Sequence, residues 1–320
     1  MRKNISKDCS IAIDYGGTKM LIGIVDRQGN ILNYKRYSTG FRDQESSKQK
    51  ILLGLDDYLK STTNENHHIR GIGIGIVGYV DPKTGYWHVM YDEGDHGVAL
   101  AEIIEKIYNI PCSIDNDVKA ATIAEMEFGI GKNTDDFIYL NIGTGIAAGF
   151  VCNKRLVRGV SNDAGEIGHI FVEGYSKVRC WCGLYGCFEA LSSGYGIVVR
   201  YTSSTKDSFS KISNESKNAI TVTNIFKQAK EGDILSKRIA VDAADAISKM
   251  IVNLSKIFNT GTIVLNGGVV TNQWFYKAIK DNLIYRNKSN SEIKIILSKF
   301  NPSMIGLIGA AMLGFRTLPY

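Results

Sequence analysis

The 320-residue sequence lacks any apolar run long enough to cross a membrane, and no N-terminal apolar stretch precedes a cleavage site. A membrane helix needs about 18 or more consecutive apolar residues, and a secretory leader needs a shorter apolar core. We therefore expect a soluble, cytoplasmic protein with no membrane partner. Apolar residues still make up 44% of the chain, so two domains with sizeable cores can form.

The chain also lacks a concentration of charge of one sign. Lysine and arginine total 38 against 32 acidic residues, a net charge of +6, and no run of five basic residues occurs. Nucleic-acid grooves and anionic membrane surfaces are normally recognised by clustered basic residues. We therefore expect no nucleic-acid partner. No GxxxxGK[ST] sequence occurs either, which disfavours a P-loop nucleotide site.

Cysteines are few, six in the whole chain. Cys9, Cys112 and Cys152 lie in or beside apolar stretches, where a thiol behaves as a small hydrophobic side chain. In a cytoplasmic protein, close-set cysteines are more often metal ligands than disulfide partners. The other three cysteines and one histidine fall within 19 residues, at His169, Cys180, Cys182 and Cys187.

One nitrogen and three sulfur donors make up a closed tetrahedral zinc site. Gly183 and Gly186 permit the tight turns that such a loop needs, and the polar Lys177 and Arg179 make the loop a poor core segment. The spacing CxCx4C is only moderately specific, so a set of buried thiols beside a core histidine stays an alternative. Since four protein ligands leave no open position, we expect the zinc to be structural.

Strands and helices alternate along the chain, which is typical of α/β architecture. Hydrophobic periodicity predicts strands over 11–14, 20–26, 71–80, 111–114, 137–142, 146–152 and 262–265. The same analysis predicts helices over 49–61, 98–108, 118–129, 233–258 and 305–315. Residues 202–218 are rich in Ser, Lys and Asn, and we expect a surface loop there.

Two of the predicted hairpins carry glycine and threonine in their turns, DYGGTK at 14–19 and GTG at 143–145. Glycine permits positive φ and close backbone approach, and successive N–H groups can bind phosphate. A plain hairpin turn would explain either motif alone, but the recurrence favours phosphate binding and indicates an internal duplication. Asn266-Gly267-Gly268 follows a third strand. Asp14 would repel a phosphate unless a cation such as Mg²⁺ mediates.

Asp115-Asn116-Asp117 ends one predicted strand and begins a helix. Asp and Asn are favoured N-caps, which is the simplest explanation. The alternative is a general base at the carboxyl end of a strand, where α/β sheets hold their sites. The triplet alone does not decide between the two.

Together these residues resemble the ROK family (repressor, ORF, kinase) of the actin-like ATPase superfamily, the type that includes glucokinases and N-acylhexosamine kinases. The resemblance runs along nearly the whole chain. It covers DYGGTK at 14–19, GIGIGIVGYVDPKTG at 71–85, IDNDVKAATIAE at 114–125, NIGTGIAAGF at 141–150, AGEIGH at 164–169, CWCGLYGCFE at 180–189 and VLNGGV at 264–269.

The resemblance implies a role for each matching residue. Asp117 is the base that activates a sugar hydroxyl, and Asp115 has a supporting role at most. The residues that contact the sugar are Asn116, Glu166, His169 and Glu189. ATP and Mg²⁺ are held by Asp14, Gly16, Gly17, Thr18, Lys19, Gly143, Thr144, Gly145, Gly267 and Gly268. Zinc is bound by His169, Cys180, Cys182 and Cys187.

The resemblance also implies two actin-like (ribonuclease H-like) α/β domains around a central cleft, and a homodimer. We expect a small domain over 1–116, joined by a C-terminal helix at about 303–320, and a large domain over 117–302 with the zinc-binding loop. The expected activity is ATP-dependent phosphorylation of a hexose or N-acylhexosamine at O6. The identity of the sugar is left open, because the stretch YDEGDHGVAL at 91–100 departs from the family pattern.

Two other functions are compatible with the same family. Its transcriptional repressors carry a helix-turn-helix domain before the first phosphate turn, and we expect none here because that turn already begins at Asp14. A catalytically inactive sugar sensor is the second. The presence of Asp14, Asp117 and both Gly-Thr turns favours the kinase over the sensor.

Overall fold

The computed structural model describes residues 8–40, 43–62, 67–89, 96–172, 178–205, 220–286 and 293–315. The chain forms two compact units. The first unit comprises residues 1–134, 154–164 and 300–320, and the second comprises residues 135–153 and 165–299. The boundary predicted after residue 116 stays a prediction, although the helix that follows it groups with the first unit.

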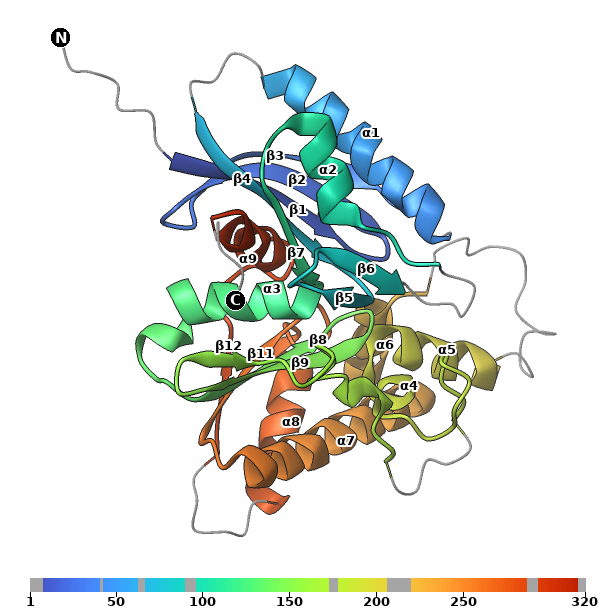
Figure 1. Cartoon of the computed structure of the whole chain (residues 1–320). Helices are drawn as coiled ribbons and strands as arrows, with labels where there is room; N and C mark the ends of the chain where they lie inside the picture. Colours follow the sequence, from blue (N-terminus) through green and yellow to red (C-terminus); the bar gives the residue numbers. More distant parts are fainter. Residues whose placement is uncertain are drawn as a thin grey trace. The chain divides into compact units, whose positions relative to one another are not determined.

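The sheet of the first unit begins with the predicted hairpin. Its strand order is β3-β2-β1-β4-β7 (Figure 1). The strands are β1 (Asp8–Tyr15), β2 (Lys19–Asp26), β3 (Ile31–Ser38), β4 (His68–Ile76) and β7 (Cys112–Asn116). β1, β2 and β3 pair antiparallel, whereas β4 and β7 run parallel to β1. Parallel strands align their carboxyl ends along one edge, and that edge carries the candidate site.

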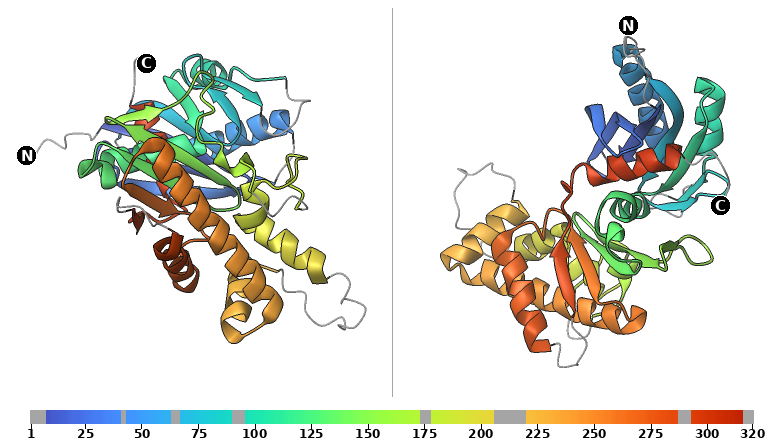
Figure 2. Two further views of the ribbon diagram at one scale, coloured as in Figure 1. Left: turned by 90° about the horizontal axis from the view of Figure 1, so that it is seen from below. Right: turned by 90° about the vertical axis from the view of Figure 1, so that its left-hand side faces the viewer.

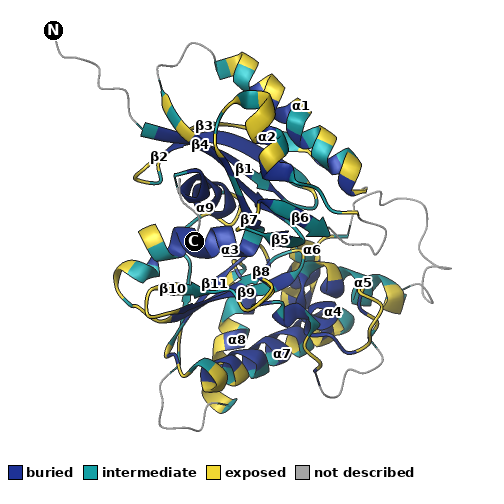
Figure 3. Cartoon of the chain, viewed as in Figure 1, coloured by how far each residue is buried: buried dark blue, intermediate teal, exposed yellow. Residues whose placement is uncertain are grey.

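Helices cover both faces of this sheet because alternate residues of each strand point to opposite sides. On one face, Ile11 and Ile13 pack with residues of α1 (Gln44–Thr62) and α2 (Leu100–Tyr108). On the other, Ala12 packs with α3 (Asp117–Phe128) and α9 (Ile305–Gly314). Figure 3 shows α9 buried along its whole length, as its small and apolar side chains predict.

Glycines in β4 let α9 approach the sheet closely. A Cβ added at Gly73 would lie 2.6 Å from the backbone N of Gly314 and would overlap the carbonyl of Ala310. The letters from Gly73 to Gly78 match the spacing GxGxxG, but they run along a strand instead of opening a helix. Gly73 and Gly75 are therefore packing positions in β4, Gly78 lies in the bend after the strand with φ +100, and the three do not form a dinucleotide-binding turn.

The second unit repeats the same plan. An antiparallel hairpin is followed by two strands parallel to its first strand, in the order β9-β8-β11-β12. The strands are β8 (Phe137–Ile142), β9 (Ile146–Cys152), β11 (Thr262–Asn266) and β12 (Lys294–Leu297). The recurrence of this plan agrees with the predicted internal duplication.

The second unit also contains helices. They are α4 (Phe188–Ser192), α5 (Gly194–Thr205), α6 (Val222–Glu231), α7 (Ile234–Phe258) and α8 (Gln273–Arg286). The long α7 packs against α6 and α8 (Figure 2). The surface loop predicted over 202–218 is wrong at its start, since Thr202–Thr205 belong to α5, and residues 206–218 lie outside the described residues. No helix in the described ranges combines the length and apolarity needed to span a membrane.

Candidate active site

Acidic side chains line the carboxyl edge of the first sheet. Asp14 of β1, Gly75 of β4 and Asp115 of β7 lie in one register across three parallel strands. Asp117 is the first residue of α3, directly after β7. A Cβ added at Gly75 would lie 3.6 Å from the Cα of Asp117, so the glycine leaves room between the two outer strands.

The pKa values of both Asp14 and Asp117 are raised, and the Asp117 carboxylate contributes to the shift at Asp14. Burial raises the pKa of Asp14 to about 7, the nearby Asp117 carboxylate raises it as well, and Lys19 opposes both. Burial also raises the pKa of Asp117, against the opposing effects of the Val118 N–H and of Lys119. Two partly buried carboxyl groups with raised pKa values favour a bound cation or a shared proton, and perturbed pKa values of this kind are common in active sites.

Asn116 is the N-cap of α3. Its Oδ1 accepts hydrogen bonds from the N–H groups of Val118 and Lys119 at 3.0 and 3.3 Å, and its Nδ2 donates to the carbonyl of Gly78 at 3.3 Å. The N-cap interpretation therefore holds for Asn116. It does not account for Asp117, which lies inside the helix, so the base interpretation stays open for that residue.

Asp115 forms a buried network that sequence reasoning missed. Its side chain is fully buried and pairs with Nη2 of Arg158 at 2.7 Å. Asn162 donates from Nδ2 to Asp115 and to the carbonyl of Val80, both at 3.0 Å, and accepts from Arg158 Nη1 at 2.8 Å. The only sequence signal was the run RGVSND at 158–163, just after β10 (Arg155–Val157). This network fixes the strand end that precedes Asp117.

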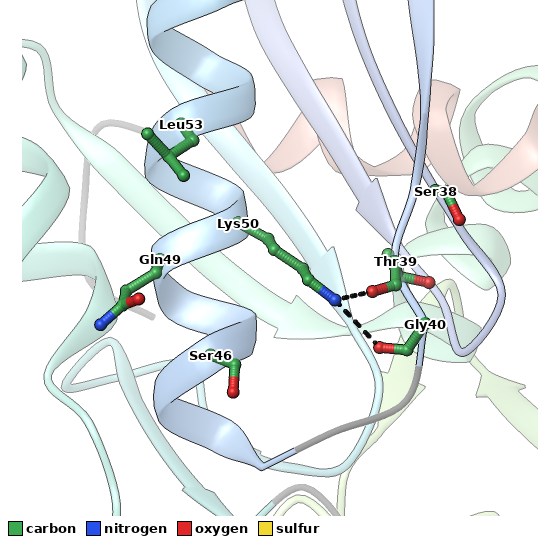
Figure 4. Close-up of a pocket in the computed structure, with 7 residues that line it drawn as sticks. All are labelled: Ser38, Thr39, Gly40, Ser46, Gln49, Lys50 and Leu53. Atoms are coloured by element: carbon green, nitrogen blue, oxygen red, sulfur yellow. Dashed lines mark hydrogen bonds between the residues drawn. The ribbon is translucent and has the colours of Figure 1, made fainter.

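The turn after Asp14 is held by its neighbours. The Gly16 N–H donates to the Lys19 carbonyl at 3.0 Å, and the hydroxyl of Thr39 donates to the Gly16 carbonyl at 3.2 Å. Lys50 of α1 in turn donates to the carbonyls of Thr39 and Gly40, and these three residues line part of a surface pocket (Figure 4). The connection between β3 and α1 thus braces the predicted phosphate turn, in which Gly17 and Thr18 follow Gly16.

The turn Gly143-Thr144-Gly145 closes the hairpin of β8 and β9 in the second unit. Gly143 donates to the Gly145 carbonyl at 3.0 Å. The N–H groups of Gly194 and Tyr195, at the start of α5, donate to the carbonyls of Gly143 and Thr144 at 2.8 and 3.2 Å. The carbonyls of this turn therefore have partners inside the unit.

The glycines of the predicted nucleotide site are required for different reasons. Gly267 adopts φ +104, which only glycine takes readily. Gly16, Gly17, Gly143 and Gly145 have no φ in the left-handed region. The backbone conformation therefore does not require glycine at these four positions. At Gly145 the reason is space, since an added Cβ would lie 2.6 Å from the carboxylate of Glu189. Gly268 has open space where a Cβ would be.

The segment AGEIGH lies against β9. Ala148 of β9 donates to the carbonyl of Gly165 at 2.8 Å, and Gly165 itself adopts φ +110. Glu166 then precedes the short 3-10 turn η2 (Ile167–His169). This path brings the ring of His169 to the loop that carries the three clustered cysteines.

The four predicted zinc ligands lie together. Their donor atoms are all within 4.8 Å of one another, with Cys182 Sγ 3.7 Å from Cys187 Sγ and Cys180 Sγ 3.9 Å from His169 Nδ1. Tetrahedral zinc with Zn–S bonds of ~2.3 Å requires sulfur atoms about 3.8 Å apart, so the residues fit this ion. Burial raises the pKa of Cys187 to about 12 and also raises that of Cys180, so without a cation these thiols keep their protons.

Glu189 connects the cysteine loop to the turn at 143–145. It is 6% exposed. Its Oε2 accepts from the Ile146 N–H at 2.7 Å, and its Oε1 accepts from the indole N–H of Trp181. The sequence interpretation gave Glu189 only a sugar contact, which stays a prediction, and it gave Trp181 no role.

Two sheets of one plan, each opening with a hairpin whose turn carries glycine and threonine, define an α/β protein of the actin-like class. The chain belongs to the ROK family, whose model matches residues 10–316.

Several relatives are sugar kinases. The chain is 28% identical over 263 residues to a glucokinase of Halalkalibacterium halodurans, covering 81% of this chain and 80% of the relative. It is 29% identical over 306 residues to a beta-glucoside kinase of Listeria monocytogenes, covering 93% and 95%. The crystal structure of a Streptomyces griseus ROK glucokinase with glucose and AMPPNP matches with a TM-score of 0.80 and 25% identity, over 96% of this chain and 99% of the other.

Other relatives are regulators. The transcriptional regulator NagC of Escherichia coli is 26% identical over 260 residues, and the match covers 81% of this chain but only 63% of NagC. The family therefore contains both activities, and its fold alone does not separate them.

Proposed function

We propose that the protein is an ATP-dependent sugar kinase that phosphorylates a hexose or an N-acylhexosamine at O6. The observation that carries the proposal is the pair of partly buried carboxyl groups with raised pKa values at Asp14 and Asp117, in a chain whose relatives include a glucokinase and a beta-glucoside kinase. Phosphoryl transfer needs positioning and charge stabilisation rather than covalent catalysis.

The proposed base is Asp117. A carboxylate with a raised pKa accepts a proton from a sugar hydroxyl more readily than an ordinary one. Asp14 would hold Mg²⁺, which neutralises charge on the phosphates when bound. The phosphates would bind to backbone N–H groups of the turns at 16–19 and 143–145 other than those of Gly16 and Gly143, which donate within their own hairpins. Gly267 and Gly268 would lie against the adenosine. Asn116, Glu166, His169 and Glu189 would contact sugar hydroxyls.

The test is ADP release from Mg-ATP with a panel of hexoses and N-acylhexosamines. Asp117→Asn should lower kcat by roughly 10²–10⁴-fold, which is the typical contribution of a general base, and should leave nucleotide binding in place. Glu127→Gln, which changes an exposed acid on the same helix, should behave like the unmodified protein. Full activity of Asp117→Asn would overturn the assignment of the base.

A catalytically inactive sugar sensor is the second candidate, favoured by the similarity to NagC. A sensor would bind a sugar in a calorimetric titration but release no ADP with any member of the panel. Turnover on one sugar would exclude it.

Zinc is proposed as a structural ion held by His169, Cys180, Cys182 and Cys187. The support is the separation of their donor atoms, which suits tetrahedral coordination. When bound, the ion would supply no reaction chemistry but would stabilise the loop as a fold element. The homodimer stays a prediction.

A further inference from the structure

We propose that the zinc-binding loop holds the nucleotide turn at 143–145 in shape through a hydrogen-bonded link from Trp181 to Glu189 to the N–H of Ile146. This inference rests on the proposed function, because it assumes that the turn at 143–145 binds the nucleotide. It assigns to the metal loop an effect on ATP and not only on the sugar.

The first step is the fixed carboxylate. Glu189 is buried, and each of its two oxygens accepts a hydrogen bond, one from Ile146 and one from Trp181. Ile146 is the first residue after the turn. Cβ atoms added at Gly145 and Gly168 would lie 2.6 and 3.1 Å from the same carboxylate oxygen. The two glycines therefore leave the space in which the carboxylate contacts the turn.

The second step is the path of the chain from the metal ligand to the turn. Cys187 is the N-cap residue of α4, which carries Glu189 in its first turn. Seven and eight residues after Cys187, the N–H groups of Gly194 and Tyr195 bind the carbonyls of the turn. One short segment thus begins at a zinc ligand and contacts the turn through both backbone and side chain.

The third step is the orientation of Trp181. The residue stands between Cys180 and Cys182, and its ring lies edge-on to that of His169 with 5.6 Å between centroids. Its side chain is 48% exposed, so packing alone does not fix the indole. With zinc bound, the ligands Cys180 and Cys182 would fix the backbone on both sides of Trp181 and so keep its indole N–H directed at Glu189.

The experiment compares Trp181→Phe, which keeps an aromatic ring but removes the N–H donor, with Tyr185→Phe, which changes an exposed aromatic on the same loop. Each protein is checked for one zinc per chain and titrated calorimetrically with AMPPNP and Mg²⁺. We expect Trp181→Phe to keep its zinc and to bind AMPPNP roughly tenfold more weakly, because a buried carboxylate oxygen has lost its donor. Tyr185→Phe should match the unmodified protein.

Removal of zinc with a chelator perturbs the loop in the unmodified protein as well, so this test does not depend on whether a variant folds. Chelation should weaken AMPPNP binding by the unmodified protein but add little in Trp181→Phe, since the link is already broken. Equal weakening in both proteins, or an unchanged affinity in zinc-loaded Trp181→Phe, would overturn the link.

Hydrogen exchange at the Ile146 amide tests the link without any ligand. Exchange there should be faster in Trp181→Phe and after chelation, and unchanged in Tyr185→Phe. If the zinc-loaded, unmodified protein binds no AMPPNP, the proposed function fails, while the exchange result still decides for or against the link. Unchanged exchange in Trp181→Phe counts against the link whatever the nucleotide result.

Discussion

Replacing Asp14 with asparagine should make the protein more stable above neutral pH while it destroys activity. The pKa of Asp14 rises from an ordinary 3.8 to about 7 in the folded protein. Because the folded-state pKa is the higher one, the neutral acid stabilises the fold at low pH, and this contribution is lost as pH rises from about 4 to about 7. At ~1.4 kcal/mol for each pKa unit, the full cost of ionising the group is about 4 kcal/mol at pH 8.

Between pH 5 and pH 8, Asp14 accounts for about 2–3 kcal/mol of this loss. Asp14→Asn should therefore unfold at a temperature roughly 5–10 °C higher than the unmodified protein at pH 8, with less than about half of that difference at pH 5. Mg²⁺ should narrow the gap at pH 8 by stabilising only the protein that keeps the carboxylate. Such gains in stability at the expense of function are typical of active-site charges.

The assay is thermal unfolding by calorimetry at both pH values, with and without Mg²⁺. Asp163→Asn, which neutralises an exposed acid of the same unit, should show no comparable shift. Equal melting temperatures of Asp14→Asn and the unmodified protein at pH 8 would refute the reasoning, and so would an unaltered response of the variant to Mg²⁺.

Three further changes test other parts of the structure. Arg158→Met should lower the free energy of unfolding by about 3–5 kcal/mol, because it leaves the buried Asp115 carboxylate without its charged partner. Arg155→Met, at an exposed position, should change the free energy of unfolding little. Chemical unfolding measures both variants. Cys182→Ala should lose zinc and raise the sugar KM, while Cys152→Ala, outside the cluster, should keep a full zinc content by metal analysis. Gly73→Ala should cost more than about 3 kcal/mol, since its Cβ would overlap the backbone of α9, and an unchanged melting temperature would contradict that packing.

Much of the first sheet could be read from the sequence because its signals are local. The hairpin over 11–26 follows from apolar alternation around a glycine turn, and the helix after residue 116 begins where an asparagine can cap it. Family motifs added the expectation of two actin-like units. The helix at 305–314 was expected from its small residues, but its place beside β1 and β4 was not expected from pattern alone.

What the sequence could not predict depends on pairs of residues far apart in the chain. Asp115 and Arg158 are separated by more than 40 residues, and each looks like an ordinary polar residue on its own. Trp181 stands between two predicted zinc ligands, and because zinc binding accounted for the sequence of the loop, no separate role was predicted for the tryptophan. The hydrogen bond from Trp181 to Glu189 and the burial of Glu189 leave no periodic pattern in the sequence, so hydrophobic periodicity could not predict either one. The stretch at 91–95, where the sequence departs from the family, lies outside the described residues.

The contribution of α9 to the first unit has a consequence for synthesis on the ribosome. β1 and β2 are complete by residue 26, yet Ala12, Leu21 and Val25 on one face of their sheet are covered by α3 and by a helix that begins only at residue 305. At about 5–20 residues per second, that face would wait roughly 10–60 s for its cover. The second unit, which is complete by residue 299, can fold before the first is closed. The order of folding would thus run against the order of translation, and the early apolar face is where a chaperone would be needed.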